Sequence, residues 1–233
     1  MNKVERAIIM AAGFGSRMVP VTLTTPKPLV KVNGVRIIET LIERILKADI
    51  HEIYIIRGYL KEKFDVLLEK YPFIRFIDND DYDKENNISS AIKVVDLLPN
   101  AYLCEADFVC QGDDIILPYQ EETNYLGTPV ENTDDWCFDV DENGILSNYR
   151  KGGNNCYQAF GISYWTKDDA LLLKDRLTKM YQVKVNRQEF WEMCIFKFYK
   201  DDFKIHIRKC KKESIMEIDS FDELCMIDPS YRK

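Results

Sequence analysis

The first half of the chain alternates continuous apolar runs with apolar residues at helical spacing. The run from Ala7 to Ala11 ends in glycines and is typical of a strand that is buried on both faces. From Ile38 to Leu46, apolar side chains recur every three or four residues, which predicts one face of a helix. Repeated units of this kind imply a parallel sheet with right-handed connections. Further strands are predicted at 52–57, 74–77 and 101–106, and further helices at 64–71 and 88–95.

The second half is less regular. Two strand-like runs, Trp136 to Val140 and Ile145 to Tyr149, flank an Asp-Glu-Asn-Gly segment that is typical of a hairpin turn. No Pro/Ser-rich linker and no internal repeat interrupts the sequence, so we expect one domain over residues 1–233. Helices are predicted over 173–181 and 190–199, and short strands over 205–207 and 215–218.

The composition is that of a globular protein with an acidic balance. Of 233 residues, 39 are acidic and 32 are basic, which gives a formal charge of −7. This balance argues against a surface built for broad contact with nucleic acid or anionic lipid, because both need clustered Lys and Arg. No stretch reaches the ~20 apolar residues of a membrane span, and the first apolar run is too short for a signal peptide. We expect a cytoplasmic protein that binds neither nucleic acid nor membrane.

The cysteines fit the same compartment. There are seven, and none forms a C-x-x-C pair, so a disulfide framework would leave one over. A zinc site is disfavoured because only His51 and His206 are available as imidazole ligands. We therefore expect reduced, mostly buried thiols.

A glycine-rich segment follows the first predicted strand. Gly13 and Gly15 let the backbone approach a ligand and offer N–H groups to phosphate oxygens, while Ser16 and Arg17 add side-chain donors. The segment is not a dinucleotide fingerprint, because Met18 stands where the third glycine would be, and no Walker sequence exists in the chain. For the glycines alone, a plain tight turn is an equal interpretation.

Lys27 strengthens the interpretation as a phosphate site. It stands between Pro26 and Pro28, which hold the backbone extended and present the ammonium group from a stiff segment. A lone surface lysine would have no such role. Combined with the glycines and Arg17, Lys27 predicts a local site for phosphate groups.

Two acidic pairs lie far apart in the sequence. Glu105 and Asp107 follow the strand predicted at 101–106, and Glu217 and Asp219 end a late apolar run. A few carboxylates brought together, with phosphate oxygens and water at the remaining positions, are what Mg²⁺ requires. Singly, each acid is more often a cap or turn residue, and Glu105 is left unassigned. Since ligands on open parallel sheets sit beyond the carboxyl ends of the strands, the loops after Ala11 and residue 106 are expected to share one crevice.

The glycine-rich loop followed by Pro-Lys-Pro resembles the nucleotidyltransferases that include the sugar-1-phosphate pyrophosphorylases. The resemblance implies an α/β fold, a three-layer α/β/α Rossmann-like mixed and mostly parallel sheet, with a nucleoside triphosphate as substrate. It also implies base contacts from Ala12 and Gly13, triphosphate contacts from Gly15, Ser16 and Arg17, a catalytic Lys27 near the reacting phosphates, and a metal held by Asp107 and Asp219 with Glu217 as an accessory.

A narrower resemblance covers nearly the whole chain. Six short motifs are similar to those of the bacterial CTP:phosphocholine cytidylyltransferases: Tyr59 to Glu62, Asn79 to Tyr82, Asn86-Asn87, Asp135-Trp136, Gly161 to Trp165 and Glu217 to Ser220. This implies CTP and phosphocholine as the small-molecule partners and Mg²⁺ as the cofactor. Residues 1–110 would then form a nucleotide-binding half and residues 111–233 an acceptor-binding half.

The same resemblance assigns two further groups of residues. Tyr82, Asn87 and Ser90 would read the pyrimidine, although turn and helix-cap roles explain Asn87 and Ser90 equally well. A quaternary ammonium needs an aromatic cage with a nearby anion, and the core face of a helix is an equal interpretation for the aromatic residues at 190 and 191. The residues that match the cage are Trp136, Phe190, Trp191 and Glu192.

The leading hypothesis is a Mg²⁺-dependent cytidylyltransferase that moves CMP from CTP to phosphocholine and releases pyrophosphate. Position 190 is Phe190 where a tyrosine hydroxyl is expected, so other acceptors remain open: phosphoethanolamine, 2-aminoethylphosphonate or a sugar 1-phosphate. The alternative from a different functional class is a regulatory module that binds nucleotide but has no catalytic activity. An oxidoreductase is a distant third, weakened by Met18.

Overall fold

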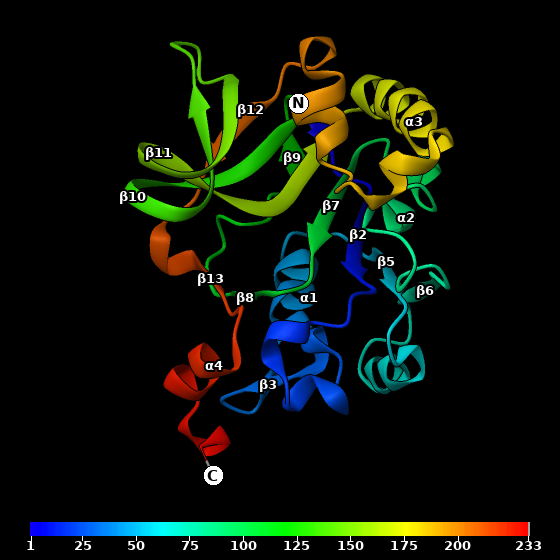
Figure 1. Cartoon of the computed structure of the whole chain (residues 1–233), viewed down its shortest axis with the longest axis vertical. Helices are drawn as coiled ribbons and strands as arrows, with labels where there is room; N and C mark the ends of the chain where they lie inside the picture. Colours follow the sequence, from blue (N-terminus) through cyan, green and yellow to red (C-terminus); the bar gives the residue numbers. More distant parts are fainter. Residues whose placement is uncertain (233) are drawn as a thin grey trace.

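The computed structural model describes residues 1–232 and is built around one seven-stranded sheet (Figure 1). Strands β2, β5, β6 and β7 run parallel, β11 is antiparallel to β7 and β10, and β12 lies parallel to β10. The mixed, mostly parallel sheet that we expected is confirmed. In spatial order the strands are β12 (His206–Lys209), β10 (Asn124–Val140), β11 (Leu146–Trp165), β7 (Ala101–Glu105), β2 (Arg6–Ala11), β5 (Glu52–Arg57) and β6 (Arg75–Asp78).

Three two-stranded pairs accompany the main sheet. The pair of β8 and β13 matters for function because Glu217 lies opposite Phe108, which brings the two distant acidic segments together. The pairs are β1 (Asn2–Lys3) with β9 (Tyr119–Gln120), β3 (Lys31–Val32) with β4 (Val35–Arg36), and β8 (Phe108–Cys110) with β13 (Ile215–Glu217).

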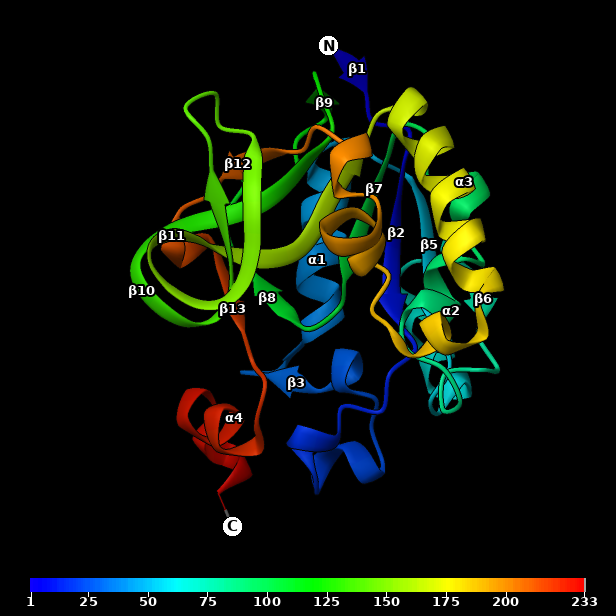
Figure 2. The ribbon, with the colours of Figure 1, turned by 45° about the horizontal axis from the view of Figure 1, so that its top comes forward.

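Helices cover both faces of the sheet and complete the three layers. In Figure 2 the strands β7, β2 and β5 lie between α1 (Ile37–Lys47) on one side and α3 (Lys167–Gln182) on the other. The short α2 (Ile88–Ala91) shares the face of α3, and α4 (Phe221–Ile227) lies near the C-terminus. A 3₁₀ helix spans 61–69, and shorter 3₁₀ or π-helical segments are found at 16–18, 21–23, 27–29, 95–97, 184–188, 194–198, 200–202, 212–214 and 229–231.

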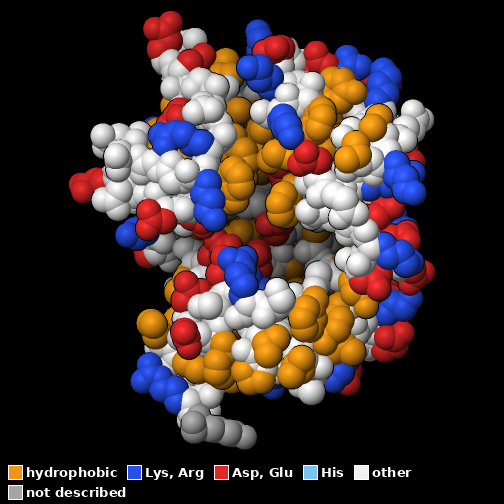
Figure 3. Space-filling view, in the orientation of Figure 1, with side chains coloured by type: hydrophobic (Ala, Val, Ile, Leu, Met, Phe, Trp, Pro, Cys, Tyr) orange, Lys and Arg blue, Asp and Glu red, His pale blue; other side chains and the backbone are white. Residues whose placement is uncertain are grey.

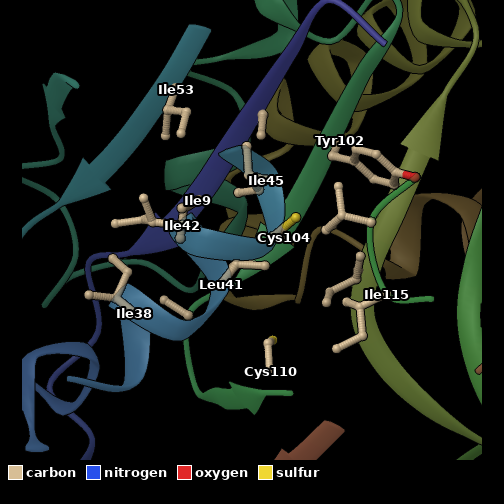
Figure 4. Packing of buried hydrophobic residues seen from close by; sticks show 14 of the residues in the cluster. Ile9, Ile38, Leu41, Ile42, Ile45, Ile53, Tyr102, Cys104, Cys110 and Ile115 are labelled. Atoms are coloured by element: carbon tan, nitrogen blue, oxygen red, sulfur yellow. The ribbon is translucent and has the colours of Figure 1, made fainter. Parts of the chain in front are cut away.

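Alternate residues of β2 pack into two separate hydrophobic clusters, one on each face. Ile9 belongs to the cluster beneath α1, in which Ile38, Leu41 and Ile42 of the helix are buried against side chains of the strands (Figure 4). Its neighbour Ile8 joins the cluster beneath α3. This burial on both faces is why the strand reads as a continuous apolar run.

The regular elements of the first half were predicted well, and the weaker helices were not. The segment predicted as a helix at 64–71 is a 3₁₀ helix over Lys61–Glu69, in which Phe64 and Leu67 are buried at the three-residue spacing that this helix requires. The helix predicted at 88–95 contains only the four residues of α2. The helix predicted at 190–199 is reduced to a π-helical turn over Cys194–Phe198, because its aromatic residues pack in several directions.

The hairpin predicted around residues 141–144 is the tip of a much longer ribbon formed by β10 and β11. Their register shifts several times between Thr133 and Val140, and Cys137 is paired with both Arg150 and Gln158. Bulges of this kind bend a ribbon and aim its side chains toward a site. The long ribbon could not be predicted, since polar residues interrupt its apolar alternation.

The predicted state of the cysteines is confirmed: all seven are free thiols, and six are buried. Within residues 1–232, no helix combines the length and the hydrophobicity that crossing a membrane requires.

Candidate active site

A cavity of about 490 Å³ opens beyond the carboxyl ends of β2 and β7. Figure 3 shows a hollow on this face, with acidic and basic side chains around it. The loops after Ala11 and Ala106 both line it, as expected for an open parallel sheet. Ser16 and Trp191 do not line it. The predicted residues that do are Ala12, Gly13, Gly15, Arg17, Lys27, Tyr82, Asn87, Ser90, Asp107, Trp136, Phe190, Glu192, Glu217 and Asp219.

The glycine-rich loop packs directly against Lys27. Gly15 has a φ of +69°, a conformation that side chains disfavour, and a Cβ there would lie 2.9 Å from Cβ of Lys27. The Thr22 hydroxyl donates to the Gly15 carbonyl at 3.0 Å and fixes the loop. Only glycine therefore lets this backbone approach so closely. Ser16 is exposed at the start of a helical turn.

Lys27 joins the two acidic segments. Its Nζ lies 3.3 Å from Oδ2 of Asp107 and 3.2 Å from Oδ1 of Asp219, although the residue is only 8% exposed. Burial opposes the charge, but the two carboxylates outweigh it and raise the pKa of Lys27 above its usual value. Arg17 adds a second cation, with Nη1 2.5 Å from Oδ2 of Asp219. Lys27 is therefore a permanent positive charge in the cavity.

Asp107, Glu217 and Asp219 form a carboxylate cluster that fits a divalent cation. One oxygen from each lies within 4.8 Å of the others. Oδ1 of Asp107 is buried and has no hydrogen-bond partner among residues 1–232, so it is available as a ligand. Burial and the neighbouring carboxylates raise the pKa of Glu217 to about 9, which marks an excess of negative charge. Oxygen ligands of this kind and number suit Mg²⁺.

Asn87 connects the two halves of the chain. It occupies the residue before α2, as predicted for a cap, but its side chain makes no cap hydrogen bond. Its amide nitrogen instead lies 3.5 Å from Glu105 and 3.4 Å from Glu192, and its oxygen accepts from the Trp191 backbone N–H at 2.8 Å. Asn87 therefore holds a pair of acidic side chains in place.

Glu105 and Glu192 form a buried acidic pair. Burial and the facing Glu192 carboxyl raise the pKa of Glu105 well above its usual value. Burial likewise raises the pKa of Glu192 to about 7. The sequence left Glu105 unassigned, and the available signal was its position at the end of a predicted strand, two residues before Asp107.

The aromatic residues that were predicted to form a cage lie in different environments in the structure. Trp136 is 37% exposed, lines the cavity and stacks on Tyr149 with ring centres 4.6 Å apart, and Phe190 is 48% exposed at the rim. Trp191 is only 2% exposed and packs in the core against Tyr125 and Trp165. Trp191 is therefore a core residue and not part of a cage, because Phe190 and Trp191 point to opposite sides of the turn.

The residues expected near a pyrimidine lie together. The Asn79 amide donates to the hydroxyls of Ser89 and Ser90, each at 2.9 Å. The ring of Tyr82 lies against Gly58, where a Cβ would come within 2.8 Å of it. Ala12 lies beside Gly58, since its carbonyl would be 2.9 Å from the same Cβ. Apart from Gly58, all of these residues line the cavity.

Several residues that line the cavity were not predicted. Tyr149 could have been found, since a hairpin centred on residues 141–144 brings it near Trp136 across the ribbon. The others were given no role at the site, and Asn79, Asn86 and Asp135 were noted only as parts of motifs that carry the resemblance. These others are Asn79, Glu85, Asn86, Ser89, Asp135, Lys151 and Met193.

This fold and this site together define a class of enzyme. The family model described as "Nucleotidyl transferase" matches residues 6–124, and the chain belongs to that family. It is a nucleotidyltransferase, and its relatives narrow the class to the cytidylyltransferases that act on phosphate-containing acceptors.

Two curated relatives cover nearly the whole chain. One, a 2-aminoethylphosphonate cytidylyltransferase of Lancefieldella rimae, is 38% identical over 97% of this chain and 92% of its own length. A choline-phosphate cytidylyltransferase of Streptococcus pneumoniae is 31% identical over 94% of each chain. A solved CTP:phosphocholine cytidylyltransferase from Streptococcus pneumoniae superposes with a TM-score of 0.89 at 29% identity, over 99% of this chain and 100% of that one.

Proposed function

We propose that this chain is a Mg²⁺-dependent enzyme that transfers CMP from CTP to a small phosphate or phosphonate bearing an ammonium group. The observation that carries the proposal is the convergence of Lys27, Asp107 and Asp219 beside the glycine-rich loop. Two cations on the nucleotide side and a carboxylate cluster facing them suit a triphosphate bound with a divalent ion.

The nucleotide would occupy the half of the cavity formed by residues 1–110. The backbone around Gly13 and Gly15 would approach the triphosphate, and Arg17 and Lys27 would exchange their carboxylate partners for phosphate oxygens. Ala12, Tyr82 and Ser90 would contact the base. Asn87 would act on the acceptor side, because its amide group already faces Glu105 and Glu192.

Asp107 and Asp219, with Glu217 as an accessory, would hold Mg²⁺. When bound, the ion neutralises charge that develops on the phosphate oxygens. An acceptor oxygen would attack the α-phosphorus of CTP in line, and pyrophosphate would leave. Because the acceptor itself supplies the nucleophile, the chain's own residues position the two substrates and neutralise their charge.

Phosphocholine is the acceptor that the sequence resemblance implies, and 2-aminoethylphosphonate is the second candidate. The second is favoured by the relative of that name, which is 38% identical. Both acceptors carry a positive nitrogen, for which Trp136, Phe190 and Glu192 line the half formed by residues 111–233. A cytoplasmic location is proposed with this function, since free thiols persist in reducing compartments.

The test is pyrophosphate release across a matrix of four nucleoside triphosphates and a set of phosphorylated amines and sugars. We expect release with CTP and with an amine acceptor, in the presence of Mg²⁺. Release only with a sugar 1-phosphate would reject the proposed acceptor class. No release with any pair would favour a catalytically silent module.

A further inference from the structure

A smaller cavity of about 90 Å³ adjoins the main one on the acceptor side. Trp136, Tyr149, Glu105 and Glu192 line both cavities, so a ligand in the main cavity can extend into the smaller one. Its lining combines aromatic rings with acidic side chains. We call it the acceptor subcavity.

Two of the four acidic residues that line the acceptor subcavity, Glu105 and Glu192, are buried without a cation of their own. Among residues 1–232, neither Glu105 nor Glu192 forms an ion pair; the Asn87 amide reaches both, and the two carboxyl groups are hydrogen-bonded to each other. Burying carboxyl groups without a positive partner is unfavourable. A positive charge from outside the chain would relieve this cost.

Tyr125 provides an independent sign of a missing ligand. The residue is 2% exposed and lines the acceptor subcavity, yet its hydroxyl has no hydrogen-bond partner in the described chain. Buried hydroxyls are normally paired, and an unpaired one costs free energy. The ring is held firmly, because Phe138 and Trp191 pack against it. The Tyr125 hydroxyl is therefore available to a ligand in the acceptor subcavity.

The aromatic rings of the acceptor subcavity pack chiefly on each other. Trp136 and Tyr149 stack at an angle of 12°, and Tyr149 also lies 4.3 Å from Phe196, centre to centre. A cage for a quaternary ammonium presents several free ring faces to the cation. Here other rings cover part of these ring faces, while Glu105, Glu192 and Tyr125 add oxygen acceptors to the lining.

We propose that the acceptor subcavity binds the nitrogen of the acceptor and selects a primary ammonium over a quaternary one. This rests on the proposed function. A primary ammonium has three N–H donors and one positive charge, and Glu105, Glu192 and the Tyr125 hydroxyl are the matching acceptors. A trimethylammonium has no N–H and would leave them unpaired. Sites built to hydrogen-bond a substrate strongly reject an analogue that lacks the group.

The test compares acceptors that differ only in N-methyl groups. Phosphoethanolamine, its mono- and dimethyl derivatives and phosphocholine would be assayed with CTP and Mg²⁺. We expect kcat/KM to fall with each methyl group, by about a hundredfold or more over the series. Turnover of phosphocholine equal to or better than phosphoethanolamine would overturn this inference and leave the proposed function intact. No turnover with any of the series or with 2-aminoethylphosphonate would instead reject the proposed function.

Two variants test whether Tyr125 and Glu192 cause the preference for a primary ammonium. Tyr125→Phe removes a hydroxyl that has no hydrogen-bond partner among residues 1–232, and Glu192→Gln removes a charge at nearly constant size. Each should lower the ratio of kcat/KM for phosphoethanolamine to that for phosphocholine, by about tenfold for the hydroxyl. Tyr164→Phe is the matched control, because Tyr164 is buried far from the site and its hydroxyl faces Asn100. An unchanged ratio in both variants would overturn the assignment.

Discussion

At the scale of residues, Lys27 decides what the site can do. It stands 80 residues from Asp107 and 192 from Asp219, and its ammonium group contacts both of these acids. A buried lysine with two carboxylate partners keeps its charge at every physiological pH. Its ammonium is therefore ready for a phosphate without a proton transfer.

Lys27→Ala should lower kcat by about a hundredfold or more, because a positioned charge at the reacting phosphates is lost. The protein should also unfold at a lower temperature, since Asp107 is left without a cation and Asp219 keeps only Arg17. Steady-state kinetics and thermal unfolding measure both effects. Lys70→Ala is the control, as Lys70 pairs with Glu43 at an exposed position far from the cavity. Turnover near that of the parent would reject the role of Lys27.

Glu192→Gln should stabilise the ligand-free protein more at pH 8 than at pH 5. The pKa of Glu192 is about 7 in the folded protein, against an ordinary value of about 4.3 in an unfolded chain. Between these values the folded state binds more protons, so stability falls as the pH rises. Glutamine does not titrate and escapes that loss. Melting temperatures across this range test it, and a constant difference between the two proteins would contradict it.

At the scale of elements, the glycine-rich loop and the β8–β13 pair place the charged groups. The loop needs Gly15 in the left-handed region, where its lack of a side chain leaves room for Lys27. The strand pair sets Glu217 opposite Phe108, and Asp219 follows two residues later. Neither element is stable alone, so both depend on the main sheet.

Gly15→Ala should lower kcat/KM with CTP by about tenfold or more, because the new methyl group would displace Lys27. Its backbone strain should also cost about 1–2 kcal/mol of stability. Gly144→Ala is the matched control: its φ of +78° imposes similar strain, but a Cβ there meets nothing within 4 Å. Kinetics and unfolding of both variants separate strain from displacement. Equal activity losses would show that displacement of Lys27 is not the cause.

At the scale of the whole molecule, the site lies where the two halves of the chain meet. Residues from β2 and β7 face residues from the β10–β11 ribbon and from the segment after β13. The cavity is lined by more acidic than basic side chains. The binding of a polyanion therefore requires both the cations of the glycine-rich loop and a divalent ion.

CTP should raise the melting temperature strongly with Mg²⁺ and only weakly after chelation. The reason is that the triphosphate alone meets repulsion from Asp107, Glu217 and Asp219. In Asp219→Asn the difference between the two conditions should shrink, because a ligand for the ion is lost. Thermal shift titrations measure this directly. An equal shift with and without Mg²⁺ in the parent protein would reject the metal site.

The sequence by itself determined the parallel half of the sheet and the chemistry of its loops. Continuous apolar runs predict β2 and β5, and short-range patterns predict Gly15, Arg17 and Lys27 as a phosphate site, because these signals are local. The acids were visible as residue types in the sequence. Their convergence, however, was expected only by resemblance.

Only the tertiary structure decided which side of each segment faces the cavity. It buries Trp191 in the core, turns Asn87 toward Glu105 and Glu192, and brings Tyr149 and Tyr125 to the acceptor side. These positions depend on bulges in the β10–β11 ribbon and on a single π-helical turn. Such irregular backbone has no repeating pattern in the sequence, since packing between distant segments determines it.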